Sequence, residues 1–101
     1  MFTVDKYRFA FGHVAFEEPK KIVRKFGQEA FITHTTACWI DVLVDDEYDL
    51  VATGVTACSI EDTFEKAEGR KKALTRALEK AGFDREFRTK VWKKYWSIAK
   101  K

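Results

Sequence analysis

The sequence predicts an α+β fold, in which a small antiparallel sheet is covered by two C-terminal helices. Two neighbouring segments, 30–44 and 50–60, are rich in the β-branched and aromatic residues that strands favour. From residue 65 onward, the apolar residues instead recur at helical spacing. The 101-residue chain is 46% hydrophobic, which is enough for one core, and it has one proline. We therefore expect a single domain over residues 1–101.

The first strand is expected over residues 2–16, where aromatic residues alternate with others at positions 7 to 11. Gly12 and His13 could form a bend or a hairpin turn there, and Glu17–Pro19 is expected to end the segment. Residues 20–29 fit two alternatives. They could form a short helix that starts after Pro19, or a short strand that ends at Gly27.

Segments 30–44 and 50–60 are expected to pair as a hairpin around an acidic turn at residues 45–49. Gly54 in the second strand indicates a bulge or the close approach of another element. Four residues of this strand share one face, because side chains alternate with a period of two: Val51, Thr53, Val55 and Ala57.

Two helices are expected near residues 65–82 and 84–99. Gly82 suits the left-handed position that ends the first helix, and Asp84 can cap the second. The second helix carries an apolar stripe at helical spacing: Phe87, Val91, Tyr95 and Ile98.

Charge is distributed unevenly along the chain. Residues 1–60 hold 6 Lys/Arg and 9 Asp/Glu, a net −3, whereas residues 61–101 hold 13 and 7, a net +6. This asymmetry predicts a polarised surface that anionic ligands meet on its basic side. The alternative is an ordinary solvated face of lysine-rich helices.

The start of the first helix is the most informative stretch. A helix N-terminus exposes unpaired backbone N–H groups and the positive end of the helix dipole. Asp62 can cap this helix, and Gly69 costs helical stability, so the regular part could begin nearer Gly69. Cations crowd its first turns and predict a site for phosphate or nucleic acid: Lys66, Arg70, Lys71, Lys72 and Arg76. The alternative is a solvated face with ion pairs such as Glu68 with Lys72.

A second cluster, Trp92, Tyr95 and Trp96, lies among the lysines of the last helix. Aromatic rings between cations can stack bases while the lysines hold phosphates. The same rings could instead pack in the core or at a subunit interface, because anchoring aromatics are enriched at interfaces. These three residues are therefore candidates for partner binding, and a homo-oligomer is plausible.

The sequence contains no motif of a known catalytic or nucleotide-binding loop. Cys38 and Cys58 are expected to be reduced structural thiols, and neither they nor His13 and His34 show the close pairs of zinc ligands. The acidic turn at 45–49 lacks the spacing of a calcium loop. We expect no enzyme activity, no cofactor and no metal. With no apolar run of about eighteen residues and no signal-like start, we expect a cytoplasmic protein without membrane contact.

The block from Cys58 to Leu78 reads Cys-Ser-x-x-Asp-x-Phe-x-x-x-x-Gly-Arg-Lys-x-Ala-Leu-x-Arg-Ala-Leu and follows a predicted strand. It resembles a motif of small phage-encoded accessory proteins. The resemblance implies a viral protein of the host cytoplasm that counters host defence. Its partner would be a host defence protein or an anionic nucleotide or nucleic acid, since anti-Thoeris proteins sequester nucleotide signals.

A second resemblance covers Gly69–Ala73, which is similar to the basic helix start of double-stranded RNA-binding domains. It implies that Arg70, Lys71 and Lys72 contact phosphates. This chain departs from that family, because no N-terminal helix precedes the strands and an extra helix follows. The leading hypothesis is thus a non-enzymatic phage accessory protein that acts by binding. The alternatives are a general nucleic-acid-binding module that uses its basic helix N-terminus, and an oligomeric structural protein.

Overall fold

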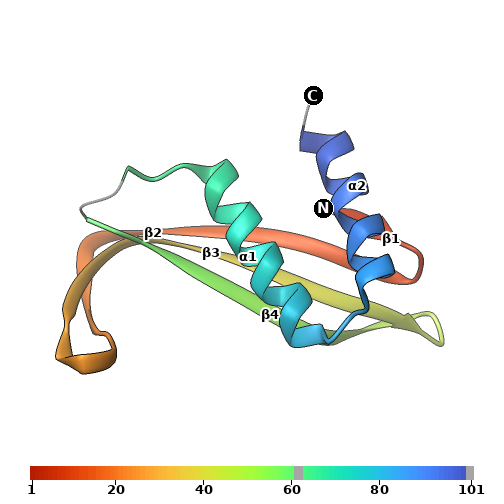
Figure 1. Ribbon diagram of the computed structural model, residues 1–101, viewed down its shortest axis with the longest axis horizontal. Coiled ribbons are helices and arrows are strands. Elements are labelled where there is room, and N and C mark those ends of the chain that lie inside the picture. The colour runs from red at the N-terminus through yellow and green to blue at the C-terminus, as the bar shows by residue number, and fades with distance from the viewer. Residues whose placement is uncertain (61–62, 100–101) are drawn as a thin grey trace.

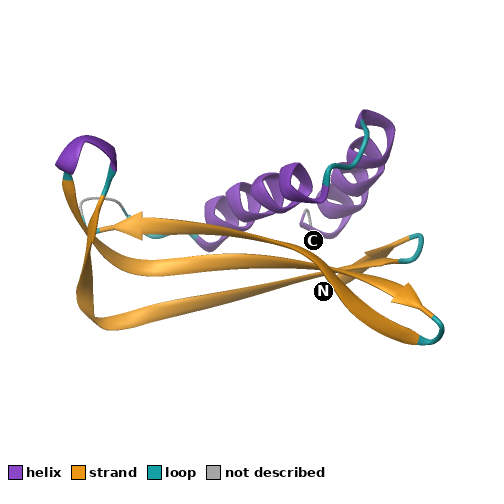
Figure 2. Ribbon diagram, turned by 90° about the horizontal axis from the view of Figure 1, so that it is seen from below, coloured by secondary structure: helices purple, strands orange, loops and turns teal. Residues whose placement is uncertain are grey.

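A computed structural model describes residues 1–60 and 63–99. Its strands form one antiparallel sheet in the order β1-β2-β3-β4, with β1 Phe2–Val4, β2 Tyr7–Val23, β3 Glu29–Val44 and β4 Glu47–Ser59. Two helices follow, α1 Lys66–Ala81 and α2 Arg85–Ala99. Both helices lie on the same face of the sheet (Figure 1, Figure 2). The predicted α+β fold is confirmed.

The N-terminal part forms two strands where one was predicted. A turn at Asp5 (φ 54°) lets β1 pair with β2, so that Phe2 lies opposite Phe9. Gly12 and His13 lie in the middle of β2 and form no bend or turn, because both pair with β3.

The predicted end of the first strand at Glu17–Pro19 is wrong, since β2 continues to Val23. The register between β2 and β3 shifts between Ala15 and Lys20, so the residues between them bulge out of the ladder. A bulge tolerates Pro19, which has no backbone N–H to donate.

Residues 20–29 follow the strand alternative in part, since the strand ends at Val23 and not at the predicted Gly27. β2 and β3 pair up to Val23 opposite Glu29, and a 3-10 turn (η1, Lys25–Gly27) joins them. The tip of this hairpin presents Phe26, which is fully exposed and has a left-handed backbone (φ 66°). The hairpin extends beyond the helices and bends toward the side on which they lie (Figure 2).

The hairpin of β3 and β4 is confirmed, but its turn is shorter than predicted. Asp45 (φ 49°) and Asp46 (φ 66°) are its two central residues. Positive φ at both positions is typical of the tight type I′ turn, which matches the twist of the flanking strands. Glu47 therefore already pairs with Val44 as part of β4.

Helix α1 packs very closely on β3 and β4, because small residues line the contact. A Cβ atom on Gly54 would lie 2.2 Å from the carbonyl oxygen of Ala73, and one on Gly69 would lie 2.5 Å from Oγ1 of Thr36. The close approach predicted at Gly54 is thus confirmed. Gly69 lies inside α1, which begins at Lys66 with Glu65 as N-cap. The predicted cap Asp62 lies outside the described residues.

Helix α2 covers the aromatic start of the sheet. Tyr7 contacts Phe87 edge-on, with ring centroids 5.2 Å apart, and the Tyr95 ring lies 6.3 Å from that of Phe2. The predicted caps are confirmed: Asp84 Oδ1 accepts the Phe87 N–H at 2.8 Å, and Gly82 ends α1 with φ 72°. Among the described residues, no helix is long and apolar enough to cross a membrane.

Candidate functional site

Side chains of α1 and α2 line an open groove of about 620 Å³ on the outer surface of the helical layer. Helix α1 contributes charged and polar side chains, and α2 contributes two tryptophans. The groove is lined by Glu68, Lys71, Lys72, Thr75, Arg76, Glu79, Trp92 and Trp96. It thus combines three of the five cations predicted at the helix start with two of the three aromatic residues predicted on α2.

Local helix geometry explains why these residues meet. Lys72 and Arg76 are four residues apart on α1, and Trp92 and Trp96 are four apart on α2, so each pair lies on one helix face. The sequence shows each pair but not that the two faces border the same groove. That depends on how α1 and α2 pack on the sheet.

The two tryptophans form a stacked pair at the groove. Their ring centroids are 6.2 Å apart with an interplanar angle of 27°, and Trp96 is 42% exposed. Tyr95 is only 5% exposed and packs beneath them against Phe2 and Phe11. Of the three aromatic candidates, Tyr95 therefore supports the surface from the core, and the tryptophans form it.

Lys71 is held in place beside the aromatic pair. Its Nζ lies 2.5 Å from Oε1 of Glu68 and 5.8 Å from the centre of the Trp96 ring. The hydrogen bond to Glu68 raises the pKa of Lys71, and the same contact lowers the pKa of Glu68. Lys71 thus remains charged near neutral pH and lies next to an exposed ring face.

Arg76 has a structural contact as well as a place in the groove. Its Nη1 donates to the carbonyl oxygen of Val55 at 2.5 Å. Strand β4 is an edge of the sheet, so this bond covers one carbonyl that a further strand would otherwise use. A guanidinium has five N–H donors, and one contact leaves others for a ligand.

The remaining two predicted cations lie on another side of α1. Arg70 lines a hollow of about 300 Å³ beside Phe11, Tyr95 and Ile98. Both Lys66 and Arg70 act electrostatically on His13 of β2. The five cations therefore do not form one anion site, since Arg70 and Lys72, only two residues apart, line different surfaces.

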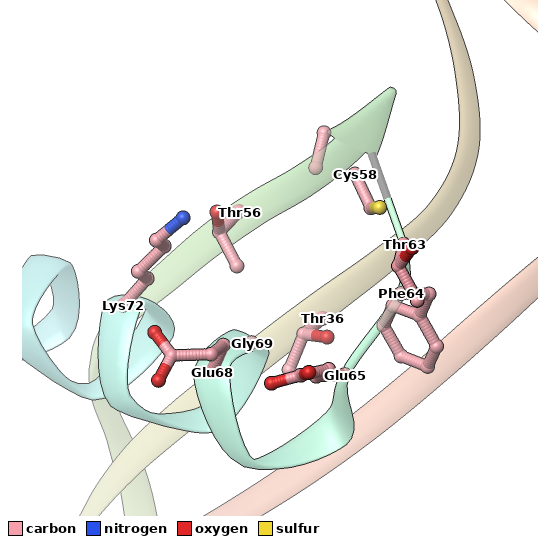
Figure 3. A pocket seen from close by; sticks show the side chains of 10 residues that line it. Thr36, Thr56, Cys58, Thr63, Phe64, Glu65, Glu68, Gly69 and Lys72 are labelled. Carbon is pink, nitrogen blue, oxygen red and sulfur yellow. The ribbon is translucent and has the colours of Figure 1, made fainter. Parts of the chain in front are cut away.

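A smaller pocket of about 280 Å³ lies at the start of α1 (Figure 3). Its wall includes the side chains of Thr36 and Thr56 from the sheet, and Glu65 and Glu68 join Lys72 on the helix side. The helix N-terminus predicted to hold an anion thus has one cation and two carboxylates along this pocket. The groove has three cations for the same number of carboxylates, which makes it the better phosphate site.

The sequence did not predict a cluster of side chains near this pocket. The His34 and Phe64 rings stack with centroids 4.1 Å apart, and His13 Nδ1 lies 2.9 Å from Oγ1 of Thr36. Burial lowers the pKa of His13, and the nearby Arg70 and Lys66 lower it further.

Burial also raises the pKa of the Cys38 thiol, to about 12. Among the described residues, no group of three or more His, Cys, Asp or Glu side chains could hold a metal ion.

We expect His13 to make stability depend on pH. Because folding lowers its pKa, the unfolded chain binds the proton first as the pH falls. Its contribution is complete above the ordinary histidine pKa of about 6.5 and is lost as the pH drops toward the lower folded value. Urea midpoints measured between about pH 5 and 7.5 should therefore change less with pH in His13→Gln than in the wild type. Identical pH slopes would contradict this assignment.

The fold and the groove define an α+β protein with a basic, tryptophan-lined surface on its helical layer. The chain matches no protein-family model, no curated protein and no solved structure.

Proposed function

We propose that the protein is a non-enzymatic nucleic-acid-binding protein that holds a single-stranded segment in the groove between α1 and α2. One observation carries the proposal: a stacked tryptophan pair, of which Trp96 is exposed, and three cations line the same open groove. Base stacking on aromatic rings combined with phosphate contacts is how proteins bind single strands without reading their sequence.

Each side of the groove has its own role. The exposed face of Trp96 stacks a base, while Lys71 and Lys72 contact the phosphates beside it. Bases are available for stacking in single strands and are hidden inside a duplex, so the groove favours single strands.

The charge of the helical layer supports this proposal. Residues 63–99 hold 11 Lys/Arg and 5 Asp/Glu, a net +6, and the two helices lie on one face of the sheet (Figure 2). A concentrated positive field on one side speeds the approach of a polyanion and orients it toward the groove.

The resemblance to small phage-encoded accessory proteins adds a biological setting to this proposal. In that setting, the protein would counter a host defence by capturing a nucleic acid or an anionic nucleotide in the host cytoplasm. Capture needs affinity and no chemistry, which agrees with the lack of catalytic motifs in the sequence.

The test is binding of the wild type and of Trp96→Ala to fluorescent single-stranded and duplex DNA and RNA at low salt. The loss of one stacked base should weaken single-strand binding by about 1–3 kcal/mol, or roughly 5- to 150-fold. Trp96 is partly exposed, so the variant should remain folded. Tyr48→Ala, which removes a similarly exposed ring from the opposite face of the sheet, is the matched control. Lack of single-strand binding by the wild type would rule the proposal out.

A further inference from the structure

The face of the sheet opposite the helices is uncovered and largely apolar. Strand register places its side chains in cross-strand rows, such as Ala10–Trp39–Thr53 and Gly12–Ala37–Val55. Six large side chains with exposed surface lie on this face: Val14, Trp39, Leu43, Tyr48, Leu50 and Val55. An antiparallel sheet with one wet face normally alternates apolar and polar side chains, so a sheet that is apolar on both faces is typical of one that is covered twice.

The centre of this face is flat for a specific reason. A Cβ atom on Gly12 would lie 2.8 Å from Cη2 of Trp39, so the indole ring lies across the bare backbone of β2. A glycine inside a strand weakens it, and here the glycine makes room for a ring on the side away from the core. The result is a smooth apolar platform.

The charges on this face cancel each other. Between the rows that start at Arg8 and at Val14, its charged side chains are Arg8 and Asp41, which form a salt bridge at 3.0 Å. The Arg8 guanidinium also lies 3.7 Å from the centre of the Tyr48 ring. Neither a nucleic acid nor an anionic lipid surface finds an unpaired cation here, and residues 1–60 have a net charge of −3.

A partner for this face must therefore be apolar, flat and without unpaired charge, and a second copy of the same face has these properties. In a two-fold arrangement each patch meets itself, and a patch whose charges are already paired creates no like-charge contact. Two sheets that pack face to face with their apolar side chains interdigitated form a stable sandwich core.

The size of the platform is also close to that of a dimer interface. Nine residues of β3, from Thr35 to Leu43, rise about 30 Å, and three strands span about 14 Å. The projected area is thus on the order of 400 Å² per copy, or about 800 Å² for the pair. The surface of the protruding side chains adds to this flat area. This approaches the roughly 1,000 Å² that a specific interface needs.

We propose that the open face of the sheet binds the same face of a second copy, so that the protein is a homodimer joined sheet to sheet. The helical layers then lie on the two outer sides, and the dimer presents two outward-facing grooves. Two linked grooves would raise the avidity for a long single strand, but dimerisation itself does not depend on nucleic acid.

The experiment is sedimentation equilibrium of the nucleic-acid-free protein from about 1 to 100 μM, the range in which weak and moderate dimers dissociate. The test variant is Val14→Lys/Val55→Lys, which sets like charges against each other across the interface. Both side chains are about half exposed, so circular dichroism should show an intact fold. Leu50→Lys, at a side chain that is 62% exposed, is a second variant that can replace it if the double variant is unfolded. Trp96→Lys on the helical side is the matched control.

We expect a wild-type dimer, a control dimer of equal strength, and a dissociation constant raised at least tenfold in the sheet-face variants. Three results would overturn the proposal. The first is a wild-type protein that is monomeric at all concentrations. The second is an unchanged dissociation constant in lysine variants of the sheet face that are folded. The third is loss of the dimer in Trp96→Lys, which would locate the interface on α2.

Discussion

Gly54→Ala should be among the most destabilising single-methyl substitutions in this protein. The added Cβ would lie 2.2 Å from the carbonyl oxygen of Ala73 and 2.3 Å from the backbone nitrogen of Ala77. Both neighbours are backbone atoms of α1, so no side-chain rotation can relieve the contact. The helix must move off the sheet, and its own buried side chains Leu74 and Leu78 would then be less well packed.

Overpacking of a core typically costs about 1–3 kcal/mol and sometimes more. We expect the upper end here, because the clash is between two backbones. A chain of this length has roughly 5–15 kcal/mol of total stability, so the urea midpoint should fall clearly. Gly82→Ala is the control: it has open space around it, and its cost of about 1 kcal/mol comes from the left-handed backbone alone. Equal losses in the two variants would show that α1 does not depend on close contact at Gly54.

Lys71→Glu/Lys72→Glu should nearly abolish single-strand binding, if the groove is the nucleic-acid site. Affinity for single strands scales with salt to a power of about −0.7 for each phosphate contact, so each contact contributes about fivefold at 0.1 M salt relative to 1 M. Two lost contacts alone lower affinity about 25-fold, and two reversed charges add repulsion. The slope of log affinity against log salt should also become shallower by about 1.4.

The control for this prediction must have the same net charge. Lys6→Glu/Lys80→Glu changes the charge equally, at residues that do not line the groove. It should weaken binding only through the general field, with an unchanged salt slope. If both variants lose affinity equally, the positive charge of the protein acts as a whole and the groove is not a discrete site. Thermal unfolding should confirm that both variants are folded, because a surface ion pair such as that of Lys71 with Glu68 contributes little to stability.

The proposed groove and the proposed dimer face are on opposite sides of the sheet, so their tests are independent. Trp96 and Lys71 belong to the helical layer, whereas Val14 and Val55 belong to the open face. A variant of one surface serves as a control for the other. With an oligonucleotide too short to reach both grooves, loss of binding without loss of dimer, and the reverse, are therefore separate outcomes.

Local patterns in the sequence were enough to predict the two helices and the β3–β4 hairpin. The residues between the helices illustrate this, because Asp84 as N-cap of α2 and Gly82 in a left-handed conformation depend only on their nearest neighbours. The β3–β4 hairpin was predicted from β-branched residues around a polar turn. The N-terminal part was harder, since Gly12 and Pro19 usually interrupt strands. Here Gly12 gives room to Trp39, and Pro19 lies in a bulge.

The sequence by itself determined the α+β class, the two helices and the basic character of the C-terminal part, because these depend on residue type and spacing along the chain. Only the tertiary structure decided which surfaces face each other. It buried the small residues Ala52 and Gly54 under α1 and left the larger Val55 outside, because a helix can approach a strand this closely only over glycine and alanine. It also brought Lys72 to the groove that Trp96 lines. Helix geometry alone separates Lys72 from Arg70, because residues two apart in sequence point about 200° apart around a helix. Which residues of the two helices share a surface, in contrast, depends on contacts between distant segments, and no local pattern records those contacts.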